Sequence, residues 1–211
     1  MTITRLSTML LLLLAAARAA ASESDVRLPA EMLAQEQLIE LDLDPAKLEY
    51  SGRVLLTVRL TAASPRIALH SVDHTITKLV LSQNGQPINA TVEKSGPQRA
   101  FVGSRPFAPG TYQIEVVFSA KLSTQGLGLY RAQVDGQSYV LSQFESDYAR
   151  QAFPCLDEPG FKFPYQLSVR APRNSVLISN TPIEKETPVG ADRKQVLFKK
   201  TPPMPSYLLA L

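Results

Sequence analysis

Residues 142–162 read SQFESDYARQAFPCLDEPGFK, and they interrupt a chain that otherwise alternates between apolar and polar residues. Ser146 is suited to cap one short helical turn, because its side-chain oxygen can accept a hydrogen bond from a free N–H of the first turn. Pro154 ends any helix there, since the residue before a proline avoids the α region. The Asp-Glu-Pro-Gly sequence at 157–160 predicts a tight turn, in which proline fixes φ and glycine accepts positive φ. The segment therefore predicts stiff local structure around two groups of carboxylates.

The chain on both sides of this segment predicts antiparallel strands. Residues 50–62 place apolar side chains at every second position from Val54 to Leu60, with Arg53, Thr57 and Arg59 on the opposite face, as expected of a half-buried strand. Asn84-Gly85 is a strong hairpin signal, and many short strands with regular turns are typical of an antiparallel all-β sandwich or saddle. The expected strands are 38–43, 50–62, 67–70, 75–82, 88–93, 112–119, 138–144, 164–170, 176–178 and 195–199.

Segment 142–162 also carries a family resemblance. It closely resembles the signature T-Q-[FM]-E-x-x-x-A-R-x-x-F-P-C-x-D-E-P-x-F-K of the aminopeptidase N family of zinc metallopeptidases, and it departs from it at Ser142, where Thr is commoner. Three flanking sequences fit as well: GLGLY at 126–130, SNTP at 179–182 and TPPMPSYL at 201–208. The resemblance runs from about residue 38 to residue 211. It covers only the N-terminal domain of that family, which is an elongated β saddle.

The composition predicts a folded domain without a basic patch. A hydrophobic fraction of 45% in 211 residues is enough for one sizeable core, with or without a tail. The formal charge of +3 falls to +1 when residues 1–21 are left out, since they hold two of the 22 bases and none of the 19 acids. Nothing in this balance indicates nucleic-acid binding. The only cysteine, Cys155, cannot form an internal disulfide and is expected to be buried.

The N-terminus predicts export. Arg5 precedes the short apolar run 9–17, and small residues at 19–21 suit cleavage before Ser22, which is the pattern of a secretory signal peptide. The apolar run is too short to cross a bilayer, although an uncleaved anchor is the alternative. We therefore expect a signal peptide at 1–21, a flexible segment at 22–37, a periplasmic or extracellular location and no stable membrane span after cleavage.

The C-terminus predicts an interrupted domain. Residues 207–211 read YLLAL, which suggests a strand in mid-course rather than a turn or a polar tail. We therefore expect the β domain at 38–211 to be truncated at its C-terminal edge. The resemblance implies that a catalytic domain follows this strand in the family.

The chemistry of a zinc peptidase is not visible in this sequence. Zinc catalysis in the family implied by the resemblance needs H-E-x-x-H and a third ligand. The two histidines, His70 and His74, have no Glu between them and lie between expected strands. We expect them to be turn or surface residues rather than metal ligands. The resemblance therefore implies zinc in the full-length enzyme, with ligands absent from this chain, and we expect this chain alone to be inactive.

The resemblance also implies a substrate-binding role for Gln143 and Glu145. In the family the Glu at this position helps to bind the free α-amino group of the peptide, and the Gln lines the pocket for the first side chain. A carboxylate makes short, charge-assisted hydrogen bonds to an ammonium group. The residues alone leave another reading open, in which Glu145 is a surface acid paired with a nearby base such as Arg150. We expect a structural network of ion pairs and a turn, rather than substrate contacts, at Arg150, Asp157, Glu158 and Lys162.

Two functions follow from these observations. The first is the N-terminal substrate-pocket domain of an exported zinc metalloaminopeptidase, whose partners are peptides with a free N-terminus and the catalytic domain of the parent chain. The alternative is a non-catalytic β-sandwich binding module in the same compartment. A natural stop codon after Leu211 would favour the module, and an H-E-x-x-H sequence beyond it would favour the enzyme.

Overall fold

A computed structural model describes residues 27–211, so the expected signal peptide at 1–21 lies outside the described residues. Its largest element is an eight-stranded sheet in the order β12-β13-β11-β1-β2-β8-β4-β5. All neighbours in this sheet are antiparallel except β1 and β11, which are parallel. The strands are β1 Met32–Asp42, β2 Glu49–Leu60, β4 Thr75–Gln83, β5 Gln86–Pro87, β8 Gly110–Lys121, β11 Tyr165–Pro172, β12 Ile183–Val189 and β13 Arg193–Phe198.

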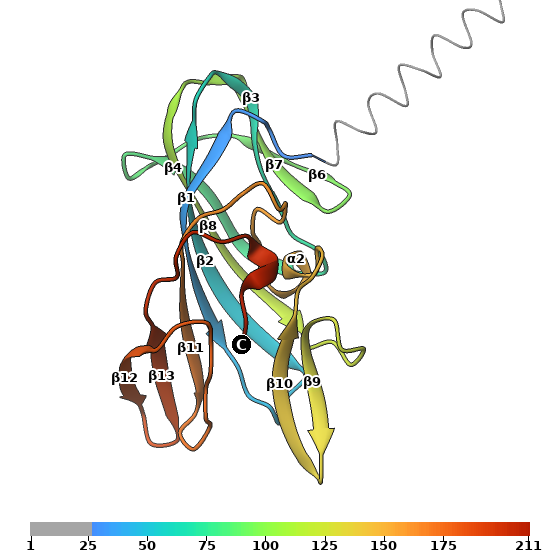
Figure 1. Cartoon of the computed structure of the whole chain (residues 1–211). Coiled ribbons are helices and arrows are strands. Elements are labelled where there is room, and N and C mark those ends of the chain that lie inside the picture. The colour runs from blue at the N-terminus through green and yellow to red at the C-terminus, as the bar shows by residue number, and fades with distance from the viewer. Residues whose placement is uncertain (1–26) are drawn as a thin grey trace, which may run out of the picture.

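Within residues 27–211, two smaller sheets and two short helices complete the fold (Figure 1). One small sheet has the order β3-β7-β6, and the other is the hairpin of β9 and β10. Segment 142–162, with helix α2, lies between these two small sheets (Figure 1). The elements are β3 Ser64–His70, β6 Thr91–Ser95, β7 Gln98–Phe107, β9 Gly128–Val134, β10 Gln137–Gln143, α2 Ala149–Ala152 and the 3-10 helix η1 Ser206–Leu208. None of the helices within 27–211 is long and apolar enough to cross a membrane.

The alternating pattern of the central strands explains this architecture. Ile39 of β1 pairs with Val54 of β2, and Val54 in turn pairs with Val116 of β8. All three side chains are almost fully buried. Because successive residues of a strand point to opposite faces, one apolar face of the sheet is covered and the other remains polar. The all-β antiparallel sandwich that the sequence predicts is therefore confirmed.

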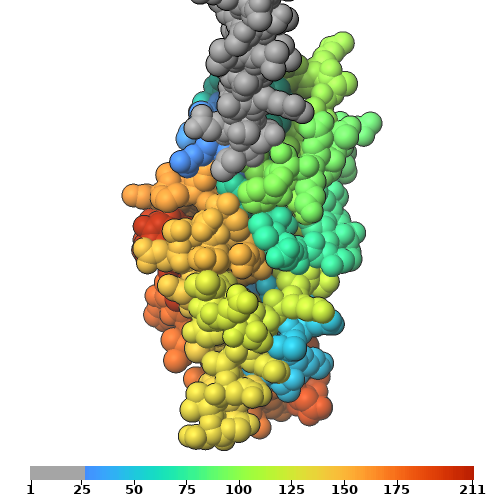
Figure 2. Space-filling view, turned by 90° about the vertical axis from the view of Figure 1, so that its right-hand side faces the viewer, coloured from blue at the N-terminus to red at the C-terminus, as the bar shows by residue number. Residues whose placement is uncertain are grey.

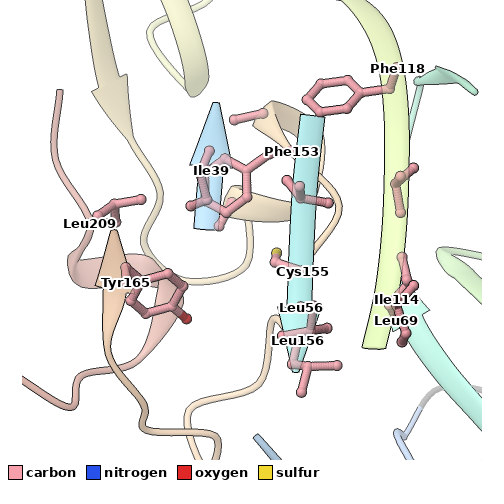
Figure 3. Close-up of a cluster of buried hydrophobic side chains, with 14 of the residues drawn as sticks. Ile39, Leu56, Leu69, Ile114, Phe118, Phe153, Cys155, Leu156, Tyr165 and Leu209 are labelled. Atoms are coloured by element: carbon pink, nitrogen blue, oxygen red, sulfur yellow. The ribbon is translucent and has the colours of Figure 1, made fainter. Parts of the chain in front are cut away.

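Segment 142–162 covers the apolar face of the large sheet. Figure 3 shows Phe153, Cys155 and Leu156 among side chains from β1, β2 and β8, and all three are at most 1% exposed. The burial predicted for Cys155 is thus confirmed, and burial raises the pKa of its thiol well above the ordinary value. The predicted cap at Ser146 is wrong. Its hydroxyl lies 3.2 Å from Asp147 Oδ1, and α2 begins later, after Tyr148.

Several strand boundaries differ from the prediction. β1 begins at Met32, so residues 32–37 of the segment expected to be flexible pair with β2. The structure has no strand at 176–178, where Val176 is 87% exposed. Strands β5, β7, β9 and β12 were not predicted from the sequence. β12 is polar and carries Pro188, which an edge strand tolerates because its outer N–H groups need no partner.

The expected strand at 207–211 is not formed. η1 includes Tyr207 and Leu208, and residues 209–211 belong to no strand. Asn180 explains this path, because its side-chain amide donates to Leu208 O and accepts from the N–H of Ala210, both at 2.8 Å. The end of the described chain is therefore held between the loop at 179–180 and strand β10.

Candidate functional site

The two residues expected to bind substrate lie on either side of a buried anchor. Phe144 is 3% exposed and packs edge-on against Phe153, with ring centroids 5.7 Å apart. Its neighbours Gln143 and Glu145 are both exposed. Because successive residues of an extended chain point to opposite sides, both polar side chains face the side away from the core.

A tight turn follows Glu145. The peptide bond between Glu145 and Ser146 is cis, and the N–H of Tyr148 donates to Phe144 O at 2.9 Å. On the other side, Gln143 pairs with Gly128 of β9. Backbone hydrogen bonds therefore hold the site residues from both directions.

Arg150 belongs to a buried ion pair and does not pair with Glu145. Its Nε donates to Asp157 Oδ2 at 2.9 Å and its N–H donates to the same oxygen at 3.1 Å. Its second ion pair, at 3.7 Å, is with Asp147. No ion pair among residues 27–211 includes Glu145. The alternative in which Glu145 neutralises Arg150 is therefore wrong, and the carboxylate is open to a cation from outside.

Asp157 joins three parts of the chain. Besides Arg150, its carboxylate accepts a hydrogen bond from Ser206 Oγ at the start of η1. Its backbone N–H donates to His70 Nδ1 at 3.1 Å. The Asp157 side chain is only 1% exposed. The hydrogen bonds that Arg150 and Ser206 donate therefore replace water around the buried carboxylate. This network connects α2 and η1 with the end of β3. It thereby fixes the part of segment 142–162 that follows Gln143 and Glu145.

The predicted structural network is otherwise only partly formed. Glu158 accepts the N–H of Leu28 at 2.8 Å and forms an ion pair with Arg27 at 3.6 Å. The predicted turn is present but lies at 158–161, one residue later than expected, because the N–H of Phe161 donates to Glu158 O at 3.0 Å. Within the described range 27–211, Lys162 takes part in no ion pair, and it is exposed.

The two histidines are buried, so the prediction that they lie at the surface is wrong, although His74 does lie in the loop between β3 and β4. His70 is 0% exposed and His74 is 8% exposed. The backbone of His70 forms two hydrogen bonds with Cys155, and His74 packs on Phe118, with ring centroids 4.7 Å apart. Contacts with segment 142–162, which are remote in sequence, bury His70 in particular.

His74 makes the stability of this fold sensitive to acid. Burial lowers the pKa of His74 to about 4, although the backbone carbonyls of Ala152 and Gln151 oppose the shift. Between pH 6.5 and 4, His74 binds a proton in the unfolded state but stays neutral in the folded state. The contribution of His74 to stability is therefore complete above pH ~6.5 and is lost as the pH falls towards 4.

We therefore expect His74 to remove about 2–3 kcal/mol of unfolding free energy between pH 7 and 4. Urea unfolding of the native chain and of a His74→Gln variant measures this, because carboxylates titrate equally in both. The difference in stability between the two proteins should change by that amount over this range. A difference that is independent of pH would rule out His74 as the titrating group.

The site is open in this chain. One surface hollow, of about 540 Å³, lies between the ends of β2 and β8 and the loop before β9. Another, of about 280 Å³, lies on the polar face of the large sheet. Neither is lined by Gln143 or Glu145. The described chain alone does not enclose a substrate around these two residues.

Comparison with known proteins identifies the family. A family model described as the peptidase M1 N-terminal domain matches residues 34–208. The chain belongs to the peptidase M1 family. Among M1 relatives, aminopeptidase M1-D of Oryza sativa subsp. japonica is 30% identical over 202 residues, which cover 92% of this chain and 23% of that relative. Aminopeptidase Q of Homo sapiens is 31% identical over 196 residues, covering 82% of this chain and 20% of that relative.

The M1 relatives are much longer than this chain. Aminopeptidase N of Acetobacter pasteurianus is 27% identical over 190 residues, which cover 88% of this chain and 53% of that relative. The chain therefore spans between a fifth and about half of the length of these three relatives.

Residues 27–211 do not fit the metal of the family. M1 aminopeptidases are zinc enzymes. Within residues 27–211, no group of three His, Cys, Asp or Glu side chains is placed to hold a metal ion. Three or four such ligands are needed around zinc. No catalytic step at zinc can therefore be assigned to the residues described.

Proposed function

We propose that this chain is the substrate-pocket domain of an exported zinc aminopeptidase, which removes N-terminal residues from peptides. Glu145 binds the α-ammonium group of the substrate, and Gln143 lines the pocket for its first side chain. The zinc-binding catalytic domain is the partner that completes the site. The observation that carries this proposal is the exposed Glu145, which has no cationic partner in 27–211 and shares a face with Gln143.

The geometry suits the recognition of one free amino group. A carboxylate at a fixed place in the pocket binds the ammonium group of a peptide through short, charge-assisted hydrogen bonds. Buried Phe144 prevents the two polar neighbours from turning inward. A fixed distance from this carboxylate to the scissile bond limits cleavage to the first residue of the peptide.

We expect the 211-residue chain alone to be unable to cleave peptides, since the residues described offer no metal site. The test is to wash the purified chain with a chelator, add zinc and measure both bound zinc and hydrolysis of aminoacyl amides. The expected result is less than stoichiometric zinc and no hydrolysis above the uncatalysed rate. Stoichiometric zinc together with amidase activity would contradict the proposal that zinc and catalysis belong to the catalytic domain.

Export is part of the same proposal. It is supported by Arg5, the apolar run 9–17 and the small residues 19–21 in the sequence, the order found in secretory signal peptides. N-terminal sequencing of the mature protein decides it. Cleavage near Ser22 supports export, and an intact Met1 in a cytoplasmic protein contradicts it.

A further inference from the structure

The hairpin of β9 and β10 ends at Gln143 and needs contacts at its base to have a fixed direction. It is a two-stranded sheet, and within residues 27–211 neither of its strands pairs with a third strand. A hairpin of this kind is only marginally stable by itself. Figure 2 shows the hairpin, in yellow, at the surface at one end of the molecule. The contacts at its base therefore decide where Gln143 and Glu145 lie.

Ser142 makes such a contact with both its side chain and its backbone. The N–H of Leu211 donates to Ser142 Oγ at 2.9 Å, and the N–H of Ser142 donates to Leu211 O at 3.0 Å. Figure 1 shows the C-terminus close to β10. Because successive residues of a strand point to opposite faces, the half-buried Ser142 side chain lies on the face opposite to Gln143. Ser142 therefore supports the site without belonging to the face that Gln143 presents.

The segment that bonds to Ser142 is itself held in place. Leu209 is 5% exposed and belongs to the core. The Asn180 side chain makes two hydrogen bonds of 2.8 Å with the backbone of residues 208–210, and Ser179 Oγ donates to the same stretch at 2.8 Å. Ser142 is therefore anchored to a part of the domain that the core and a loop both fix.

The chain beyond Ser142 is short and is anchored again at once. Phe144 is buried, and its carbonyl accepts the N–H of Tyr148 at 2.9 Å. Gln143 lies between these two anchors, and Glu145 directly follows the second. A change at Ser142 therefore shifts the backbone that carries both site residues.

We propose that Ser142 is a positioning residue, whose hydroxyl accepts the Leu211 N–H and thereby fixes Glu145 where it meets the substrate ammonium group. This inference rests on the proposed function and deepens it. Serine and threonine both offer the oxygen that the N–H requires. A side chain without this oxygen leaves the N–H without its acceptor, and a displacement of about 1 Å near a reacting group can cost up to about a hundredfold in rate.

A matched pair of substitutions tests the hydroxyl. Ser142→Thr keeps it, and Ser142→Val differs from Ser142→Thr only by a methyl group in its place. In the complete enzyme, Ser142→Val should lower kcat/KM for peptides with a free N-terminus about tenfold. Ser142→Thr should change it by less than about twofold, because the acceptor remains. Equal values of kcat/KM for the two variants would overturn the proposal.

Ser138 provides the control on the same face of β10. Its hydroxyl accepts only a long hydrogen bond, at 3.5 Å, from the exposed Gln133. Ser138→Val should therefore change kcat/KM by less than about twofold. A tenfold loss at Ser138 as well would show that any valine on this face disturbs the enzyme, and it would overturn a specific role for Ser142.

A double-mutant cycle shows whether Ser142 acts through Glu145. When residue 145 is already changed by Glu145→Gln, Ser142→Val should lower kcat/KM by less than about threefold, because the contact that it disturbs is absent. A tenfold loss in both backgrounds would overturn the proposal, since Ser142 would then act through another group.

Backbone order in the 211-residue chain tests the anchor without any substrate. The NMR order parameter of the Glu145 N–H should be about 0.85, the value of a rigid backbone, in the Ser142→Thr variant, and it should fall towards about 0.6 in the Ser142→Val variant. Equal order parameters in the two variants would overturn the anchor. Failure of the substrate-binding role would appear separately, as native kcat/KM in the single variant Glu145→Gln.

Discussion

Replacing Asp157 by Ala is expected to lower the free energy of unfolding by about 3–5 kcal/mol, because it leaves the charge of Arg150 without its buried partner. The Asp157 side chain is 1% exposed, and that of Arg150 is 14% exposed. The substitution also removes the acceptor for Ser206 Oγ and for the N–H of Arg150. A domain of this size is stable by about 5–15 kcal/mol, so the loss is a large fraction. Equilibrium unfolding in urea measures it.

Asp147 provides the matched control. It lies 3.7 Å from the same Arg150, but its side chain is 56% exposed. Asp147→Ala should therefore cost less than about 1 kcal/mol. If Asp157→Ala does not fold, Asp157→Asn keeps the shape and some hydrogen bonds and should fall between the two. Equal stability losses for Asp147→Ala and Asp157→Ala would show that the buried pair does not hold this segment.

Replacing Glu145 by Gln in the complete enzyme should lower kcat/KM for peptides with a free N-terminus about ten- to hundredfold. A hydrogen bond to a charged group contributes roughly 1.5–3 kcal/mol, and Gln keeps the shape while it removes the charge. The fold should be unaffected, because Glu145 is exposed and makes no ion pair within 27–211. A rise in KM alone would indicate lost binding, and a fall in kcat as well would indicate a misplaced scissile bond.

The control for this substitution is again Asp147. Asp147→Asn removes an exposed carboxylate two residues further along the chain. If a general negative charge near the pocket were sufficient, both variants should lose efficiency to a similar degree. The proposed contact predicts instead that Asp147→Asn changes kcat/KM by less than about threefold, since an exposed charge contributes little.

Local sequence patterns predicted most of the large sheet. β2 alternates between buried and more exposed positions from Val54 to Leu60, and Asn84-Gly85 adopts positive φ at both residues, as the hairpin between β4 and β5 requires. β12 was missed because it is a polar edge strand and carries no apolar alternation. Residues 176–178 were predicted as a strand on composition alone, yet they have no strand partner in the described chain.

The surroundings of the site were harder to predict, because they depend on contacts between distant residues. The sequence around His70 does not predict that the backbone N–H of Asp157, 87 residues later, donates to the His70 ring. Likewise, Ser206 bonds to Asp157 across 49 residues. By contrast, the family motif within the segment was enough to predict Gln143 and Glu145 as candidate site residues. Their exposure on either side of Phe144 follows from local alternation.

The contact between Glu145 and the substrate ammonium group is tested most directly by removing each partner in turn. The measurement is kcat/KM of the complete enzyme and of its Glu145→Gln variant for one peptide, with its N-terminus free or acetylated. Acetylation removes the charge that Glu145 is proposed to bind. The account predicts a loss of about ten- to hundredfold on the free peptide and a loss of less than about threefold on the acetylated one. Equal losses on both peptides would contradict a contact between Glu145 and the amino group.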